Sequence, residues 1–409
     1  MRSADPRTPD ARTPDDADVG LLSPVWAGRP IATATSDATV LAGIVLFEVA
    51  LATVMAPNGV AQRILEAAHD IDPADLVEAA RADGNPVIPL LAVLRGRLDA
   101  DDAGWLHRGA TSQDALDTSL VLMARDAAGL ITDDVAWTVG RLCQLADTHR
   151  TTVMSGRTLT QPSTPITLGL KLAGWAHSLA RAGAAVRAAS AALPVQLGGA
   201  SGTLASFVAL DGPGAGMATA ERLAAELGLA VPPAPWHVHR NPLTRLADAL
   251  TEVTDALGTI GANVAVLARN GLLDDGAAGG SSALPHKQNP VRAVLLNAAA
   301  RQAPLLAAQL HIDASTVDER PDGAWHAEWQ TLRLLLRTAG GAAATGRDLA
   351  DGLRGHSDLI AADVVAAASD LLSEAAKFVD PAPTEPADYL GEADTLTSRL
   401  IAAALEELA

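Results

Sequence analysis

The longest regular pattern of apolar positions along the chain begins at Asn241-Pro242. Apolar residues then recur three and four positions apart, at Leu243, Leu246, Leu250, Val253, Leu257, Ile260, Val264 and Leu267. This spacing forms a heptad seam and predicts one helix over 242–269, with Asn241 as its cap and Pro242 in its first turn. At 1.5 Å per residue the helix would be about 42 Å long, a length that suits an elongated bundle.

Four more segments have a helical pattern. They are 113–148, 164–192, about 324–350, and a segment opening at Asn289-Pro290, which Pro304 is expected to bend or end. Five long helices with short connections predict a central bundle domain over 106–350.

The regions on either side of the bundle differ from it in composition. Repeated prolines predict a separate N-terminal domain of shorter helices over 21–105, and weaker helical patterns predict a shortened C-terminal helical domain over 351–409. The acidic, proline-rich segment 1–20 is predicted to be a disordered tail. The expected fold is therefore all-α, with a long five-helix bundle and two smaller helical end domains.

Composition narrows the class of protein. Aromatic residues make up only 3% of the chain, so Ala, Leu and Val must fill the core, which favours helices over a β-sandwich. A net charge of −18 argues against nucleic acid or an anionic membrane as a partner. The single cysteine, the absence of zinc-ligand spacing and the lack of an apolar leader predict a cytoplasmic protein. The apolar stretch 38–56 contains Glu48 and is interpreted as too short to span a bilayer.

The run Gly279 to Pro290, GGSSALPHKQNP, could by itself be a flexible linker. It also places two hydroxyls, a cation and a helix start together, which is typical of an anion site. The run resembles the signature loop of the fumarase/aspartase superfamily, G-S-S-x-M-P-x-K-x-N-P, with Leu284 in place of the usual Met. The resemblance implies that Ser281, next to Ser282, takes a proton alpha to a carboxylate. It also implies that Lys287 and Asn289 bind a substrate carboxylate.

A second polar run, HRGATSQD, spans His107 to Asp114 and could simply cap the following helix. Together with Asp117-Thr118 it resembles the first conserved region of the 3-carboxy-cis,cis-muconate cycloisomerases. The resemblance implies carboxylate binding by Thr111 and Ser112, a substrate contact by Gln113, and an acid/base or orienting role for His107.

A third run, GRTLTQ at 156–161, resembles the superfamily pattern G-x-T-H-x-Q but has Leu159 at the histidine position. One hypothesis is an inactive enzyme. The other is a reaction in which the leaving group is a weak base, such as a carboxylate, and needs no general acid. The second hypothesis points to the cycloisomerase branch. The resemblance implies substrate binding by Arg157, Thr158 and Gln161, and by Arg240 in the run PWHVHR.

Weaker matches extend the resemblance over about 21–350. It implies a fumarase/aspartase-like fold, a small polycarboxylate substrate, and a homotetramer with sites shared between subunits. The heptad seam over 243–267 is interpreted as further support for the oligomer. Neither a metal nor an organic cofactor is expected.

The implied activity is a cycloisomerase that interconverts 3-carboxy-cis,cis-muconate and a carboxymuconolactone in protocatechuate (beta-ketoadipate) catabolism. One alternative is a lyase of the same superfamily that eliminates another weakly basic anion from a succinate-like substrate. The other is a non-catalytic structural protein on the same fold, although the intact polar runs count against it.

Overall fold

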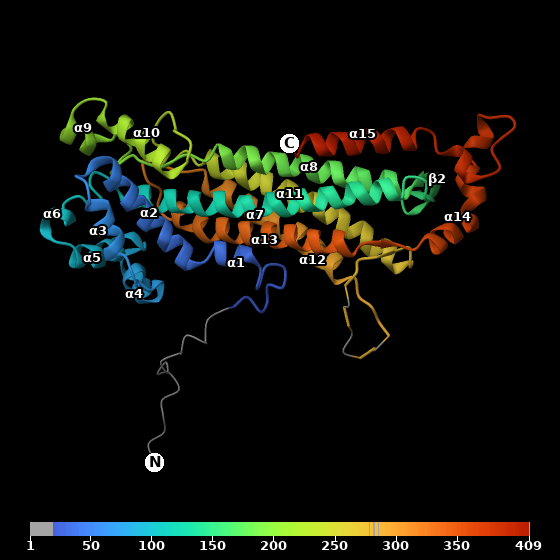
Figure 1. The fold of residues 1–409 in the computed structure, drawn as a ribbon, viewed down its shortest axis with the longest axis horizontal. Helices are drawn as coiled ribbons and strands as arrows, with labels where there is room; N and C mark the ends of the chain where they lie inside the picture. The colour runs from blue at the N-terminus through green and yellow to red at the C-terminus, as the bar shows by residue number, and fades with distance from the viewer. Residues whose placement is uncertain (1–18, 278, 281–282, 285, 409) are drawn as a thin grey trace, which may run out of the picture.

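The computed structural model describes residues 19–277, 279–280, 283–284 and 286–408. Five long helices run side by side and form an elongated bundle (Figure 1). They are α7 (Ser112–Thr148), α8 (Leu168–Ala191), α11 (Asn241–Arg269), α12 (Val291–Asp313) and α13 (Ala324–Gly352). The prediction of an all-α fold with a central five-helix bundle is confirmed.

Small residues allow these helices to pack closely. A Cβ atom added at Gly258 in α11 would collide with the Ala300 side chain of α12. One added at Gly346 in α13 would collide with Leu257 of α11. The scarcity of aromatic residues in the sequence therefore corresponds to tight contacts between Ala, Gly and Leu in the bundle core.

The helix predicted from the heptad seam is confirmed as α11. All eight seam residues are buried, with exposed fractions of 7% or less. Asn241 is the first helical residue rather than the cap, which is Arg240. Pro304 was expected to bend or end the next long helix, and α12 does not end there but continues to Asp313. Its packing against both α11 and α13 favours the helix despite the missing backbone N–H.

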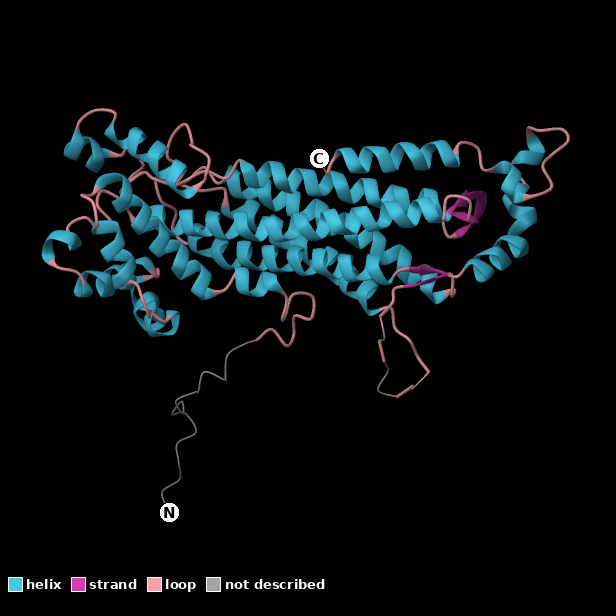
Figure 2. Cartoon of the chain, in the orientation of Figure 1, coloured by secondary structure: helices cyan, strands magenta, loops and turns pink. Residues whose placement is uncertain are grey.

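The helix predicted to start at residue 164 begins later, at Leu168. The preceding residues form an antiparallel hairpin of β1 (Val153–Thr158) and β2 (Gln161–Thr167). Thr167 ends β2 and caps α8, since its hydroxyl accepts a hydrogen bond from Leu170 N at 3.0 Å. Figure 2 shows this hairpin at one end of the bundle, with the short pair β3 (Leu273–Asp274) and β4 (Arg354–Gly355) nearby.

Shorter helices gather at the other end of the bundle, except α1, which lies alongside α7 and α13 (Figure 1). They are α1 (Pro30–Ala34), α2 (Asp37–Met55), α3 (Val60–Ala67), α4 (Pro73–Asp83), α5 (Val87–Arg97), α6 (Ala100–Ala103), α9 (Ala205–Asp211) and α10 (Ala215–Leu227). Among the described residues, α2 alone is long and apolar enough to cross a membrane. In this fold α2 packs against α7, and half of its most apolar window is buried.

The C-terminal segment contains two helices that lie in different places. Helix α14 (Ser357–Leu372) contacts the β1–β2 hairpin, whereas α15 (Ala393–Glu406) lies along α8 (Figure 1). Two single-turn helices, Ala375–Lys377 and Pro386–Tyr389, lie between them in the sequence. The division into domains at residues 20, 105 and 350 stays a prediction.

Candidate active site

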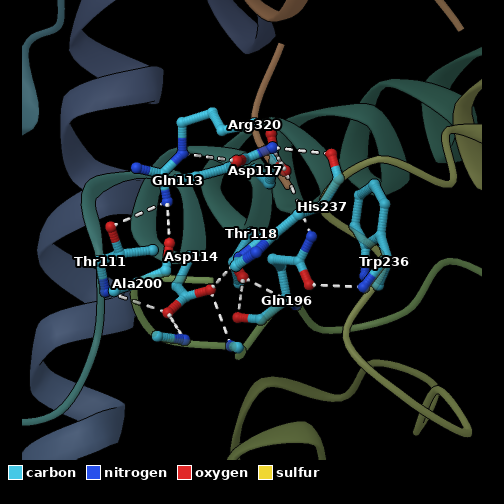
Figure 3. A network of polar contacts seen from close by, with 12 residues as sticks. Thr111, Gln113, Asp114, Asp117, Thr118, Gln196, Ala200, Trp236, His237 and Arg320 are labelled. Carbon is cyan, nitrogen blue, oxygen red and sulfur yellow. Dashed lines mark hydrogen bonds and ion pairs between the residues drawn. The ribbon is translucent and has the colours of Figure 1, made fainter. Parts of the chain in front are cut away.

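The N-terminus of α7 is the centre of a dense polar network (Figure 3). Thr111 and Asp114 form a capping box, in which the Asp114 carboxylate accepts a hydrogen bond from Thr111 N at 3.0 Å. Asp114 is fully buried and also accepts hydrogen bonds from the backbone N–H groups of Gly198 and Gly199, both at 2.9 Å. This carboxylate therefore fixes the start of α7 against the loop that contains the two glycines.

His237 completes the contacts of Asp114. Its Nε2 lies 2.7 Å from Asp114 Oδ1, and the histidine is 3% exposed. The pair joins the segment that precedes α11 to the start of α7, so three segments distant in the sequence meet at this point. Sequence reasoning did not identify His237 as part of the site.

Arg320 supplies a cation beside Thr111 and was also missed by sequence reasoning. It lies in the connection between α12 and α13, and its Nη2 donates to Thr111 Oγ1 at 3.1 Å and to Ala200 O at 3.2 Å. Its Nε donates to Gln113 Oε1 at 3.0 Å (Figure 3). No partner for its Nη1 occurs in the described part of the chain. A guanidinium group beside a helix N-terminus is suited to hold a carboxylate.

Gln113, predicted to contact the substrate, is fully buried. Its amide nitrogen donates to His237 O at 2.9 Å and to Asp117 Oδ2 at 3.2 Å. Its amide oxygen accepts the hydrogen bond from Arg320. In this structure Gln113 therefore holds Arg320 in place, and a substrate contact by Gln113 itself stays a prediction.

Arg240, also predicted to bind substrate, is only 3% exposed. Its guanidinium pairs with Asp117 at 2.7 and 3.0 Å and with Glu328 at 2.5 and 3.1 Å, and Nη1 also donates to His237 O at 3.4 Å. These bonds use all five N–H groups of the side chain. Arg240 therefore holds this buried cluster together in the structure, and its predicted contact with substrate stays a prediction.

Glu328 shares this buried cluster. Burial raises the pKa of its carboxyl to about 7, and the negative charges of Asp117 and Asp313 add to the effect, whereas Arg240 opposes it. The cluster contains more acidic than basic groups, so protonation of Glu328 stabilises the folded chain. The free energy of unfolding therefore depends on pH.

His107 lies in the turn that precedes Thr111. Its Nδ1 is 2.6 Å from Glu48 Oε1 of α2, and its backbone φ is +57°. Ser112 is the first residue of α7 and is half-buried. The predicted residues His107, Thr111 and Ser112 therefore lie together at one end of the bundle, and Arg320 joins them.

Arg157, Thr158 and Gln161 lie in the β1–β2 hairpin beyond the other end of α7. Arg157 pairs with Asp363 of α14 at 2.8 Å, and Thr158 pairs with Gln161 across the strands. Helix α7 has 37 residues, which corresponds to a length of about 55 Å. The two groups of predicted residues are thus too far apart within one chain to contact the same small substrate.

The connection between α11 and α12 contains the predicted signature loop. Asn289 joins the two ends of this loop. Asn289 N donates to Gly279 O at 2.8 Å, and its side-chain amide donates to Gly280 O at 2.9 Å. Lys287 is exposed. Ser281 and Ser282, the predicted base and its neighbour, lie outside the described residues.

No group of three or more His, Cys, Asp or Glu side chains that could hold a metal ion is found among the residues with described positions. The expectation that the reaction needs neither a metal nor an organic cofactor stays a prediction.

Comparisons with known proteins agree with this fold. A family model described as "Lyase" matches residues 31–305. A nitrosuccinate lyase of Streptomyces davaonensis is 42% identical, over 96% of this chain and 91% of that protein. A 3-carboxy-cis,cis-muconate cycloisomerase of Pseudomonas aeruginosa is 40% identical, over 81% of this chain and 75% of that protein. The solved 3-carboxy-cis,cis-muconate lactonizing enzyme of Pseudomonas putida superposes with a TM-score of 0.81 at 30% identity, covering 93% of this chain and 97% of that one.

The fold and these relatives show that the chain is an all-α enzyme of the fumarase/aspartase superfamily. It belongs to the lyase family that the matched model describes, in which its relatives include cycloisomerases and lyases. The hypothesis of a non-catalytic structural protein is therefore set aside.

Proposed function

We propose that the chain converts 3-carboxy-cis,cis-muconate to a carboxymuconolactone, in protocatechuate catabolism. In this reaction one substrate carboxylate adds to a double bond, and the carbon alpha to another carboxylate is protonated. Several cycloisomerases of this specificity are similar to the chain, which supports the proposal. The substrate carries three carboxylates, so a protein of net charge −18 needs local positive groups to bind it.

The described residues supply such groups in two places. At the start of α7, Thr111, Ser112 and Arg320 are proposed to bind one carboxylate. At the signature loop, Lys287 and Asn289 are proposed to bind another, while Ser281, next to Ser282, transfers the proton. Arg157, Thr158 and Gln161 of the hairpin are proposed to complete the site from another copy of the chain.

Leu159 is the observation that carries the proposed reaction type. It forms the two-residue turn of the hairpin with Thr160, and the backbone φ values are +48° and +75°. Positive φ values in such a turn favour Asn and Gly. Leu159 occupies the turn nevertheless, and its side chain is 97% exposed. An alkyl side chain cannot donate a proton to a leaving group, so the site suits a reaction whose reverse, lactone-opening direction releases an anion that needs no general acid. A carboxylate leaves in this way readily, whereas water or ammonia does not.

Replacing Leu159 with histidine is expected not to raise cycloisomerase turnover, because the internal carboxylate needs no acid. The measurement is the loss of ultraviolet absorbance of the conjugated diene, with Leu159→Gln as a control for polarity at the same position. A gain in turnover of about tenfold or more in Leu159→His alone would show that a missing acid limits the reaction.

A second candidate function has a specific observation in its favour. The nitrosuccinate lyase relative is similar over nearly the whole chain, and nitrite is also a weakly basic leaving group. Elimination of nitrite from a nitro-substituted succinate would therefore tolerate Leu159 equally well. Assaying diene loss from carboxymuconate in parallel with nitrite and fumarate release from nitrosuccinate separates the two functions.

The chain is further proposed to form a homotetramer with shared sites. The heptad seam of α11 does not support this, because its residues are buried within the chain itself. The outward face of α12 supports it instead, with Val291, Leu305 and Ile312 at heptad spacing and 38%, 72% and 66% exposed. Val294 on the same helix is 54% exposed. An apolar row on an exposed helix face is typical of a helix that packs against another helix.

Replacing Leu305 with arginine is expected to dissociate the oligomer and to lower activity per chain by roughly tenfold or more, because a buried charge without a partner is costly. Light scattering gives the mass and the substrate assay gives the activity. Leu65→Arg is the control, since Leu65 is 49% exposed on α3. A stable monomer of the unmodified chain with full activity would contradict the shared site.

A cytoplasmic location and the absence of nucleic-acid or membrane partners are proposed as well. The single cysteine supports the proposed location, and the net charge of −18 supports the absence of these partners, since it disfavours contact with polyanions.

A further inference from the structure

Glu48 is an unusual residue for its position in the fold. It lies in the middle of α2, a strongly apolar helix, with the buried residues Phe47 and Leu51 close in sequence, and it is 1% exposed. A buried carboxylate is costly unless a partner compensates the loss of water. A residue that served only packing would be apolar here. The buried carboxylate therefore needs a hydrogen-bonding partner.

That partner is His107. Glu48 Oε1 lies 2.6 Å from His107 Nδ1, which is short for a hydrogen bond between nitrogen and oxygen and fits a charged acceptor. Glu48 Oε2 is buried and has no hydrogen-bond partner within the described ranges. The carboxylate therefore depends on the imidazole, and the two groups are expected to be energetically coupled.

The backbone of His107 also indicates a constrained position. Its φ of +57° lies in the left-handed region, which a histidine adopts at a cost in energy. The turn is closed by a hydrogen bond from Ala110 N to His107 O at 3.3 Å, and Thr111 follows at once as the cap of α7. His107, which contacts Glu48, is therefore held four residues before the cap of α7, where the proposed carboxylate-binding residues begin.

The two ring nitrogens of His107 differ in their surroundings. Nδ1 faces Glu48, whereas Nε2 has no partner in the described structure and is not among the buried polar atoms that lack one. The side chain is 10% exposed. Nε2 is therefore the nitrogen that a ligand can reach. A carboxylate that accepts a hydrogen bond from Nδ1–H fixes the tautomer and the orientation of the ring.

We propose that Glu48 is a positioning residue that keeps the proton of His107 on Nδ1 and directs Nε2 toward the substrate bound at the N-terminus of α7. The proposal rests on the proposed function for the identity of the substrate. The pairing of Glu48 with His107 can be tested without any substrate.

The first experiment measures the tautomer directly. Nitrogen-15 NMR of the full chain labelled at histidine distinguishes Nδ1–H from Nε2–H, and the His107→Gln variant identifies the His107 signals. The unmodified protein is expected to show protonated Nδ1. In Glu48→Gln this preference should be lost, because an amide can donate to Nδ1 as well as accept from it. Glu48→Asp should retain it.

The second experiment measures kinetics on the substrate that the chain converts. Glu48→Gln is expected to lower kcat on the order of a hundredfold with little change in KM, and Glu48→Asp should recover part of the loss. The double variant Glu48→Gln/His107→Gln should be no slower than His107→Gln alone, since Glu48 acts through His107. Thermal unfolding confirms that each variant is folded.

Asp102→Asn is the matched control. Asp102 is another buried carboxylate of the N-terminal region, 4% exposed and paired with Arg63, and it does not contact His107 in the described structure. It should leave both the His107 tautomer and kcat unchanged.

The outcomes separate the two proposals. If neither candidate substrate is converted, the proposed function fails, and the NMR result alone decides the role of Glu48. An Nε2–H tautomer in the unmodified protein, or an unchanged tautomer in Glu48→Gln, would overturn the positioning role. Losses in kcat that multiply in the double variant would also overturn it.

Discussion

Replacing Ser281 with alanine is expected to lower turnover about a thousandfold with little change in substrate affinity, the loss typical of removing a positioned acid/base group. The proposed clamps at Thr111, Ser112 and Asn289 remain intact in this variant, so binding should persist. A serine hydroxyl is a weak acid, and it can transfer a proton only where N–H donors and a cation stabilise its ionised form. Lys287 is the cation proposed for this task.

The measurement pairs turnover with calorimetric affinity for a tricarboxylate analogue. Ser282→Ala is the matched control, because it removes a neighbouring hydroxyl and should cost much less. Lys287→Ala should instead weaken both binding and turnover, since it meets charge that is present in the ground state and in the transition state. Near-normal turnover of Ser281→Ala would transfer the proton role to Ser282 or His107.

The sequence alone predicted the parts of the fold that depend on local periodicity. The seam from Leu243 to Leu267 predicted α11 because burial on one face repeats with the period of the helix. The β1–β2 hairpin was missed, since the segment between Thr158 and Thr167 has no strict alternation and contains prolines. The continuation of α12 through Pro304 depends on packing against α11 and α13, which no local pattern reveals.

The site was predictable only where it is contiguous in the sequence. The run from His107 to Asp114 does mark the start of α7, and Asn289 does lie at the base of the signature loop. Arg320 was missed because it reaches Thr111 across 209 positions of sequence. The surroundings of Arg240 were not predictable for a related reason. The sequence shows a cation, but it does not show the two buried carboxylates that occupy it.

Replacing Arg240 with methionine is expected to lower the free energy of unfolding by about 3–5 kcal/mol, the usual cost of leaving buried charges without their partner. Asp117 would keep the hydrogen bonds from Trp325 Nε1 at 2.9 Å and Gln113 Nε2 at 3.2 Å. Glu328 would lose its only cation in the described structure. The loss of stability should appear in thermal or denaturant unfolding. Substrate binding should also weaken, because Gln113 is hydrogen-bonded to Asp117 of this cluster and holds Arg320 in place.

The size of the loss is expected to depend on pH. The pKa of Glu328 is about 7 in the folded chain and has an ordinary value of 4.5. Its protonated form therefore contributes stability that is full below pH 4.5 and is lost as pH rises through about 7. Removing Arg240 takes away an interaction that lowers this pKa, so the pKa rises further and the extra destabilisation grows above pH 7. Unfolding measured from pH 5 to about pH 9 tests this dependence. Glu328→Gln is the control, because it removes the titrating group and should flatten the curve in both backgrounds. A loss of equal size across that range would contradict the role assigned to Glu328.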